Sequence, residues 1–322
     1  MASPNLSEIV TTTLRNRTGK LRDNVSDNTI LFRRLKERGK VVPVDGGVDI
    51  NEELEYAENG SYTRYSGYQT VNIQPSDVFT AATFAWKQAA VAVSISGLEE
   101  LQNAGRERVI NLVRSRVDNA ERTFVNNLSA DMYSDGTASG GKQVGGLQHI
   151  IADSPTTGTV GGINRASFSF WQNQTQSGSS STALTAANIQ DGMNSMWVQL
   201  VRNNDKPDII SMDNNFWLLY LASLQTNQRF ASEEKAAAGF NAIKFMSADV
   251  LLDGGFGGDA PTNHAYFINT NYLHWRPHRD RNMVPLNPDR FATNQDAHIK
   301  LIGWAGNLTC SNASLQGVLI NP

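Results

Sequence analysis

GLEELQNAGRERVINLVRSRVDNAERTFVNNLSADMY, residues 97–133, carries the strongest helical signal in the chain. Ser96 and Glu99 precede it as a capping box, with serine at the N-cap and glutamate three residues later. The spacing predicts one helix over 97–133, roughly 50 Å long at 1.5 Å per residue. Such a helix in a chain of 322 residues predicts an elongated molecule. An apolar stripe runs along it at spacings of four and three residues: Val109, Val113, Val117, Ala120, Phe124 and Leu128.

An acidic hairpin is predicted before this helix, over residues 44–75. The segment DGGVDINEELEYAENGSYTRYSGYQTVNIQP, residues 45–75, has extended-type residues on both sides of Asn59-Gly60. Asn-Gly is a strong hairpin signal, because both central positions of a type I′ turn need a positive φ. An isolated two-stranded hairpin is marginal in water, so we expect this one to lie on the protein's own body or on a neighbouring molecule.

Charge is distributed unevenly around a net value of −3. Residues 1–40 hold nine Lys/Arg and four Asp/Glu, whereas residues 41–60 hold six acids and no base. A basic arm followed by an acidic segment predicts two surfaces that meet different partners, with locally solvated charge as the alternative. The arm, which includes a predicted short helix at Asn28–Glu37, can contact DNA phosphates without sequence specificity.

The rest of the chain mixes strands and helices whose partners lie far apart in sequence, which predicts an α+β fold. Residues 76–96 are predicted to be β-rich, and residues 134–183 to be loops with short strands at 147–151 and 166–171. The following elements are predicted in order: a helix from Thr185 to Leu200, a strand at 208–212, a helix from Asn214, a strand at 242–252, a strand at 264–269, a loop at 274–294, and a final β pair at 297–310 and 313–320.

Known catalytic and cofactor-binding signatures are missing from the sequence. It has no Gly-x-x-x-x-Gly-Lys-Ser/Thr loop, no Gly-x-Gly-x-x-Gly before a helix and no Gly-x-Ser-x-Gly elbow. The single cysteine, Cys310, excludes an internal disulfide and a cysteine-ligated zinc site, and we interpret it as structural. No apolar run approaches the roughly 20 residues that cross a bilayer, so no membrane contact is expected. We predict no catalytic residue, no cofactor and no metal.

The densest cluster of reactive side chains is His274-Trp-Arg-Pro-His278-Arg-Asp280. Two histidines four residues apart could share a helix face and bind a metal, but Pro277 between them argues against a helix. A metal-dependent enzyme that uses the His274–Asp280 loop is therefore only an alternative hypothesis. Arg276, Arg279 and Arg281 are interpreted as a patch for carboxylates on another segment or subunit, or as a solvated loop.

The order of these pieces resembles the major capsid protein of tailed double-stranded-DNA bacteriophages, which has the Hong Kong 97-type fold. The resemblance covers nearly the whole chain and depends on the order of segments rather than on any single residue. The stretches that match best are the helix at 97–133, KPDIISMDNNFWLLYLASL at 206–224, FNAIKFMSADVLLDGG at 240–255, and DAHIKLIGWAGNLTCSNASLQGVLI at 296–320.

The resemblance implies a division of the chain and a structural role. It implies a self-assembling subunit, arranged as hexamers and pentamers in an icosahedral head that encloses packaged double-stranded DNA. The protein would be assembled in the bacterial host cytoplasm and be part of the virion. An encapsulin-like nanocompartment shell is the alternative with the same fold. The implied parts are an N-terminal arm (1–43), an extended loop (44–75), a peripheral domain (76–145 and 266–306, with the spine helix 97–133) and an axial domain (146–265 and 307–322), whose segments 253–259 and 226–240 are candidates for the capsomer centre.

The resemblance also implies contacts and partners. Glu52, Glu53 and Glu55 on the extended loop would contact a neighbour's spine helix, at Arg106, Arg108, Arg114 or Arg116. Arg276, Arg279 and Arg281 are further candidates for contacts between subunits. Residues 44–75 contain no lysine, and the nearest is Lys87, so the covalent lysine–asparagine cross-link of some members is not expected. About 96 residues precede the spine helix, so a separate scaffold protein is expected, with a portal and a possible decoration protein.

Overall fold

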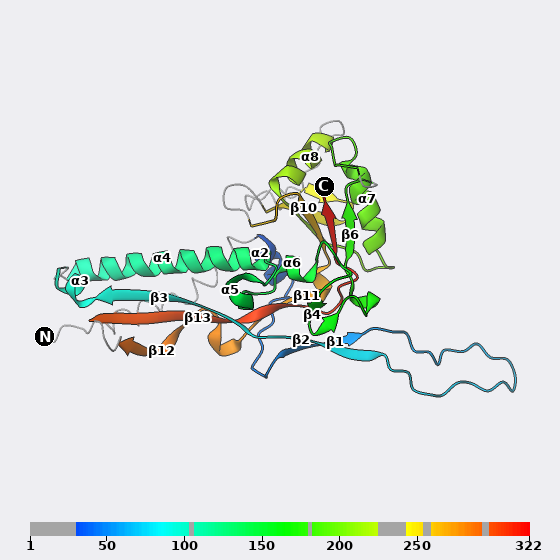
Figure 1. Ribbon diagram of the computed structural model, residues 1–322, viewed down its shortest axis with the longest axis horizontal. Helices are drawn as coiled ribbons and strands as arrows, with labels where there is room; N and C mark the ends of the chain where they lie inside the picture. Colours follow the sequence, from blue (N-terminus) through cyan, green and yellow to red (C-terminus); the bar gives the residue numbers. More distant parts are fainter. Residues whose placement is uncertain (1–29, 103–105, 180–181, 225–242, 254–258, 292–295) are drawn as a thin grey trace.

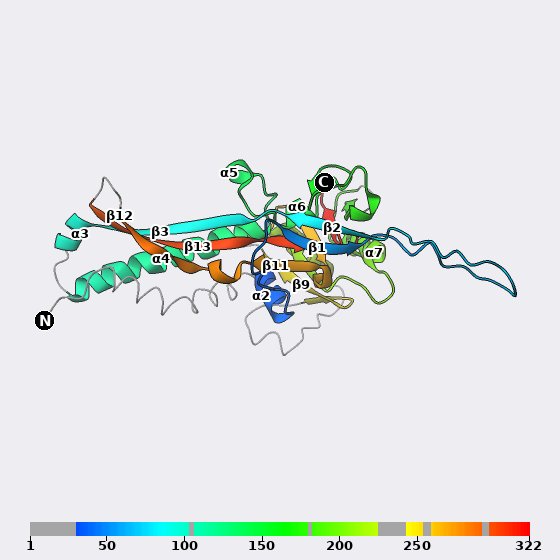
Figure 2. The ribbon, with the colours of Figure 1, turned by 90° about the horizontal axis from the view of Figure 1, so that it is seen from below.

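The computed structural model describes residues 30–102, 106–179, 182–224, 243–253, 259–291 and 296–322, and shows an elongated molecule (Figure 1). One long arm contains helix α4 (Arg106–Met132) beside strands β3 (Lys87–Ser96) and β13 (Ala297–Cys310). A block of helices and strands stands at the other end of this arm, and a hairpin extends beyond it. In Figure 2, which is turned by 90° from Figure 1, the hairpin again projects beyond the body. The predicted elongated shape is confirmed.

A four-stranded antiparallel sheet forms the arm. Strand β13 pairs with β3 along one edge, from Ala297 opposite Ser96 to Gly306 opposite Lys87. On its other edge β13 pairs with β12 (Val284–Phe291) and then with β11 (Leu273–Pro277). Helix α4 packs against this sheet and buries the later part of its apolar stripe, Val117, Ala120, Phe124 and Leu128. The described part of the predicted apolar stripe therefore faces the core.

The predicted single helix over 97–133 is two helices in the structure. Helix α3 (Gly97–Gln102) comes first and α4 starts at Arg106. The Arg116 guanidinium donates a hydrogen bond to the Glu99 carboxylate. In one straight helix these residues, 17 positions apart, would be separated by about 25 Å, so the two helices cannot share one axis. The predicted capping box is confirmed: Ser96 N donates to Glu99 Oε2 (3.1 Å) and Glu99 N to Ser96 Oγ (3.3 Å).

A six-stranded mixed sheet forms the block, in the order β6-β14-β10-β7-β9-β8. Its two faces belong to different cores. Ile210 and Phe267 face a core with helices α7 and α8, whereas Ile209 and Tyr266 face the core that contains the end of α4. The elements are β6 (Gln174–Ser177), α7 (Ile189–Leu200), β7 (Ile209–Met212), α8 (Asn214–Leu224), β8 (Ile243–Phe245), β9 (Ala248–Leu252), β10 (His264–Ile268) and β14 (Gly317–Ile320).

Several local predictions are corrected. Residues 242–252 are not one strand, because β8 and β9 form a tight hairpin about Met246, whose φ is +50°. Residues 147–151 contain helix α6 (Leu147–Ile150), and 166–171 contain the 3₁₀ turn η1 (Ser169–Trp171). The predicted loop at 274–294 holds β11, the 3₁₀ turn η3 (Arg279–Arg281) and β12. The final strands β13 and β14 belong to different sheets and do not pair. The remaining elements are α5 (Ala138–Gly141), β4 (Thr159–Val160), β5 (Ile163–Asn164) and the 3₁₀ turn η2 (Thr270–Tyr272).

The later part of the predicted N-terminal arm is built into the body. Helix α2 (Ile30–Glu37) buries Leu31, Phe32 and Leu35. After it the chain runs parallel to β11, where Val42 N donates to Trp275 O at 2.9 Å. The first 29 residues lie outside the described part of the chain, as do most of segment 253–259 and all of segment 226–240. The proposed domain limits at 265/266 and 306/307 fall inside β10 and β13.

Candidate interaction surface

The hairpin begins with two paired strands and continues as a projection. Strands β1 (Ile50–Glu55) and β2 (Phe79–Phe84) pair from Ile50 opposite Phe84 to Glu55 opposite Phe79. This register places the centre of the hairpin at residue 67, where Gly67 has a φ of +59° and Gln69 N donates to Ser66 O (3.4 Å). The predicted hairpin is therefore confirmed, but its reversal is not at Asn59-Gly60. Tyr62 N donates to Asn59 O (3.3 Å), so only a local turn forms at Asn59-Gly60. That pair lies on the outgoing side of the hairpin.

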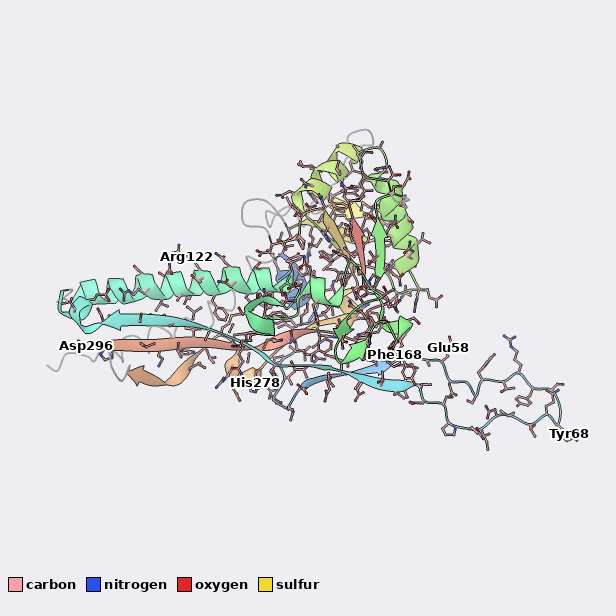
Figure 3. All side chains as sticks on the ribbon, viewed as in Figure 1. Glu58, Tyr68, Arg122, Phe168, His278 and Asp296 are labelled. Atoms are coloured by element: carbon pink, nitrogen blue, oxygen red, sulfur yellow. The ribbon has the colours of Figure 1, made fainter. Side chains whose placement is uncertain are left out.

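Residues 56–78, the projecting segment, expose large side chains to solvent. Figure 3 shows Glu58 near the base and Tyr68 at the far end, beyond the body of the molecule. Tyr62 is 78% exposed and Ile73 is 90% exposed. A clustered set of exposed apolar side chains is characteristic of a surface that binds another macromolecule. The exposed members are Tyr62, Tyr65, Tyr68, Val71 and Ile73.

A buried ion pair fastens the base of the hairpin to the arm. Arg276 on β11 donates from Nε to Glu52 Oε1 (2.7 Å) and from a terminal nitrogen to Oε2 (3.0 Å). Thr309 on β13 also donates to Oε1, at 2.7 Å. Strand β1 alternates between buried and exposed residues, so Glu52 lies in the interior while Glu53 and Glu55 face solvent. Glu52 and Arg276 thus bond to each other within one chain.

The other predicted contact residues fall into three groups. Arg279 forms an exposed ion pair with Asp45 (2.8 Å), and Arg281 is exposed on η3. Arg116 bonds within the chain, to the Glu99 carboxylate and to the Ser94 carbonyl. The side chains of Arg106, Arg108 and Arg114 lie outside the described residues. A contact of Glu53 or Glu55 with a neighbour's spine helix stays a prediction.

A second, shorter hairpin supports the base of the first. Strands β4 and β5 are joined by Gly161 and Gly162, and Gly161 O accepts a hydrogen bond from Thr83 N of β2 (2.9 Å). Gly161 has a φ of +57°, and a Cβ there would lie 2.8 Å from Ala82 Cβ. Tyr56 stacks on Phe170 with ring centroids 5.2 Å apart. The hairpin therefore leaves the body in a direction that several independent contacts maintain.

The His274–Asp280 cluster does not form an α-helix. His274 lies on β11, Pro277 ends that strand, and His278 Nδ1 accepts from Asp280 N (3.1 Å) at the start of η3. The expectation that Pro277 prevents a helix is confirmed. Burial lowers the pKa of His274; the nearby Glu52 carboxylate opposes this shift and Arg276 adds to it. Across the described residues, no three His, Cys, Asp or Glu side chains are grouped to hold a metal ion.

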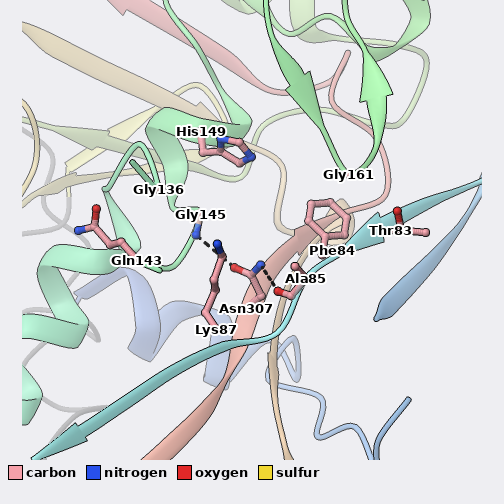
Figure 4. Close-up of a pocket in the computed structure, with 10 residues that line it drawn as sticks. All are labelled: Thr83, Phe84, Ala85, Lys87, Gly136, Gln143, Gly145, His149, Gly161 and Asn307. Carbon is pink, nitrogen blue, oxygen red and sulfur yellow. Dashed lines mark hydrogen bonds between the residues drawn. The ribbon is translucent and has the colours of Figure 1, made fainter. Parts of the chain in front are cut away.

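A pocket of about 160 Å³ lies between the β2–β3 connection, residues 136–149 and β13 (Figure 4). Asn307 joins these walls: its amide donates to Ala85 O (2.9 Å), and its Oδ1 accepts from Gly145 N (3.2 Å). Lys87 donates to Gly141 O. Burial lowers the pKa of His149, and the charges of Arg165 and Lys87 lower it further. The Asn307 and Lys87 side chains in this pocket thus connect neighbouring segments of the fold.

Cys310 is fully buried, and burial raises the pKa of its thiol to about 12, so it is protonated and unreactive at neutral pH. Its interpretation as a structural cysteine is confirmed. In the described ranges, every helix is too short or too polar to span a membrane.

The solved structures that resemble this chain agree on one fold. No protein-family model and no curated protein sequence matches the chain. A solved structure of the cyanophage A-1(L) capsid is similar over 88% of this chain and 90% of its own, with 15% identity and a TM-score of 0.65. The capsid of a native GTA particle is similar over 89% of both chains, with 13% identity and a TM-score of 0.61. A chain of the satellite phage P4 procapsid, a structure that includes the size determination (Sid) protein, is similar over 94% of this chain and 90% of its own, with 12% identity and a TM-score of 0.52.

These similarities extend over most of each chain and define the class of the fold. The chain has the α+β, Hong Kong 97-like fold of phage capsids, as the order of its segments predicted.

Proposed function

We propose that this chain is a major capsid protein, the self-assembling subunit of an icosahedral phage head that encloses double-stranded DNA. The observation that carries the proposal is the projecting segment 56–78, which exposes Tyr62, Tyr65, Tyr68, Val71 and Ile73 beyond the body of a capsid-type fold. Its large side chains gain burial only when another molecule covers them. A neighbouring subunit in a closed shell would supply that cover at every position of the lattice.

The mechanism of such a protein is physical rather than catalytic. Each subunit would place its projecting segment on a neighbour within hexamers and pentamers, and each contact would contribute a modest free energy. Glu53 and Glu55 are placed on the solvent side of β1, where they can meet a neighbour's Arg106, Arg108 or Arg114. Arg279 and Arg281 are exposed and remain candidates for the same kind of contact. The role requires no cofactor and no catalytic residue.

The proposed partners follow from this role. Packaged DNA would meet the basic N-terminal residues, which carry nine Lys/Arg against four acids in the first 40 positions. A separate scaffold protein is proposed, since the similar P4 procapsid structure includes an additional size determination protein. A portal is proposed as a further partner, and a decoration protein is an optional one. The protein would be assembled in the host cytoplasm and be part of the virion.

The proposal is tested by isolating particles from cells that express the chain with its genomic neighbours. We expect large particles that protect double-stranded DNA from nuclease. The matched variant replaces residues 61–74 with a short Gly/Ser turn, which leaves the paired strands β1 and β2 in place. This variant should fold and remain a small species. Particles that protect a cargo enzyme and no DNA would contradict the phage proposal and favour a nanocompartment.

A further inference from the structure

A cluster of hydrogen bonds surrounds Asn59-Gly60, the dipeptide that does not form the hairpin turn. Ser76, on the returning side of the hairpin, accepts a hydrogen bond from Gly60 N (3.0 Å) and donates one to Asn59 Oδ1 (2.8 Å). Ser61 donates to the same oxygen from its backbone nitrogen (3.0 Å) and from its hydroxyl (2.8 Å). Both the amide nitrogen of Gly60 and the carboxamide of Asn59 are therefore held in place.

Asn-Gly is also the dipeptide in which an asparagine side chain reacts most easily with the backbone. Glycine has no side chain to obstruct the approach of its nitrogen. In that reaction the Gly60 nitrogen loses its proton to a base in solution and forms a bond to Asn59 Cγ. The bond from Cγ to Nδ2 breaks, and Nδ2 leaves as ammonia. Water then opens the succinimide ring to aspartate or isoaspartate, so one water is consumed and one ammonia released.

We propose that Asn59-Gly60 is a spontaneous deamidation site that Ser76 keeps unreactive while the two sides of the hairpin are together. Attack requires the Gly60 nitrogen to lose its proton and to turn toward Asn59 Cγ. Its N–H is instead directed at Ser76 Oγ, and the carboxamide is held by donors on its oxygen. Asn59 and Gly60 are both exposed to solvent, so burial does not protect them. The protection comes from the hydrogen bonds that cross the hairpin.

Deamidation of Asn59 would change both the charge and the backbone at that residue. The product adds a negative charge directly after the exposed Glu58 in an already acidic segment, and isoaspartate adds one carbon atom to the backbone. The Ser76 contact would be altered at the same time. This inference concerns the isolated chain and does not depend on shell assembly, so its failure would leave the proposed function untouched.

The test compares the full chain with two serine variants during incubation in a mildly alkaline buffer. Ser76→Ala removes the hydroxyl that contacts both reacting groups. Ser66→Ala is the matched control, because Ser66 lies in the tip turn and contacts Gln69. Peptide mass spectrometry measures the gain of one mass unit at residue 59. We expect Ser76→Ala to react at least about fivefold faster than the unchanged chain, because the substitution removes two hydrogen bonds that each contribute modestly. Ser66→Ala should react at the same rate as the unchanged chain.

Two results would overturn the proposal. One is a Ser76→Ala variant that reacts at the unchanged rate or more slowly. The other uses no variant: the unchanged chain in concentrated urea should react faster than the folded chain, and equal rates would show that the hairpin gives no protection. Gly60→Ala identifies the site, since it should slow the mass gain at residue 59 in urea.

Discussion

Glu52 and Arg276 are 224 residues apart in the chain and bind each other through two hydrogen bonds, of 2.7 and 3.0 Å. The Glu52 side chain is only 8% exposed. Removal of one member of a buried pair leaves an uncompensated charge in a poorly solvated site. The pair therefore holds the base of the projecting hairpin on the arm, and its loss should weaken the fold.

Arg276→Ala should lower the free energy of unfolding by about 3 kcal/mol, at the low end for a buried pair because the Arg276 side chain keeps 20% exposure. Urea titration of the purified chain measures this change. Arg279→Ala is the matched control: its pair with Asp45 is exposed on both sides, and its loss should cost about 0–1 kcal/mol. Equal losses in the two variants would contradict the structural role of Glu52.

Charge reversal at Glu53 and Glu55 tests the contact between subunits without disturbing this pair. Both residues lie on the solvent side of β1, so the double substitution to lysine should leave the urea midpoint almost unchanged. Shell formation should fall sharply, because the new charges would repel the neighbour's arginines. Sedimentation of cell lysates measures the assembled fraction. Normal particle yield in the stable double variant would show that the predicted pairing is wrong.

The tyrosines of the projecting segment should be needed for assembly and not for folding. Tyr62, Tyr65 and Tyr68 are exposed, so the triple substitution to serine should leave the thermal midpoint close to that of the unchanged chain. The assembled fraction should fall, because the neighbour loses apolar contact area. Thr63→Ser with Thr70→Ser, on the same segment, is the control and should assemble normally. A triple variant that assembles as well as this control would refute the docking role.

Glu99 should titrate at unusually low pH. The hydrogen bond from Arg116, followed by that from Ser96 N, lowers the pKa of Glu99 from 4.5 to about 2. Since the folded-state pKa lies below the unfolded value, the stabilisation is complete above pH 4.5 and is lost as the pH falls toward 2. NMR titration of the Glu99 carboxyl measures the pKa directly. Arg116→Ala should return it toward the ordinary value, and an unchanged pKa would exclude the Arg116 contact.

Gly161 should tolerate alanine poorly compared with Gly140. Both have positive φ, +57° and +69°, so both substitutions carry the cost of left-handed backbone. Only at Gly161 does the new Cβ meet Ala82 Cβ at 2.8 Å, whereas the site at Gly140 is open. Gly161→Ala should therefore lose about 1–3 kcal/mol more stability in urea titration than Gly140→Ala. Equal losses would indicate that the β4–β5 hairpin does not press on β2.

Sequence patterns that span only a few residues predicted much of the fold. The apolar stripe around Phe124 and Leu128 predicted the long helix. Ser96 with Glu99 predicted the capping box that precedes it. The break between α3 and α4 was missed, since the apolar pattern alone does not report the long-range contact of Glu99 with Arg116. Long-range pairing is likewise absent from local patterns, which is why β13 and β14 were expected to pair although they lie in different sheets.

The candidate interaction surface was predicted in outline only. The strong Asn59-Gly60 signal placed the turn too early, because the register is set by the pairing of Ile50 with Phe84 at the other end of the hairpin. Residue type alone does not separate Glu52 from its neighbours in an acidic run. Its position between Ile50 and Leu54, on the buried side of an alternating strand, was the one local signal of its interior location. Its partner, Arg276, is revealed only by the folded chain.

The central claim, that this chain builds a closed shell, is tested most directly by negative-stain electron microscopy of the protein purified with its genomic neighbours. The account predicts closed shells, or tubes and rings of capsomers. A species that stays small when a scaffold protein is present, and that carries stoichiometric metal, would contradict it and favour the enzyme hypothesis for the His274–Asp280 segment.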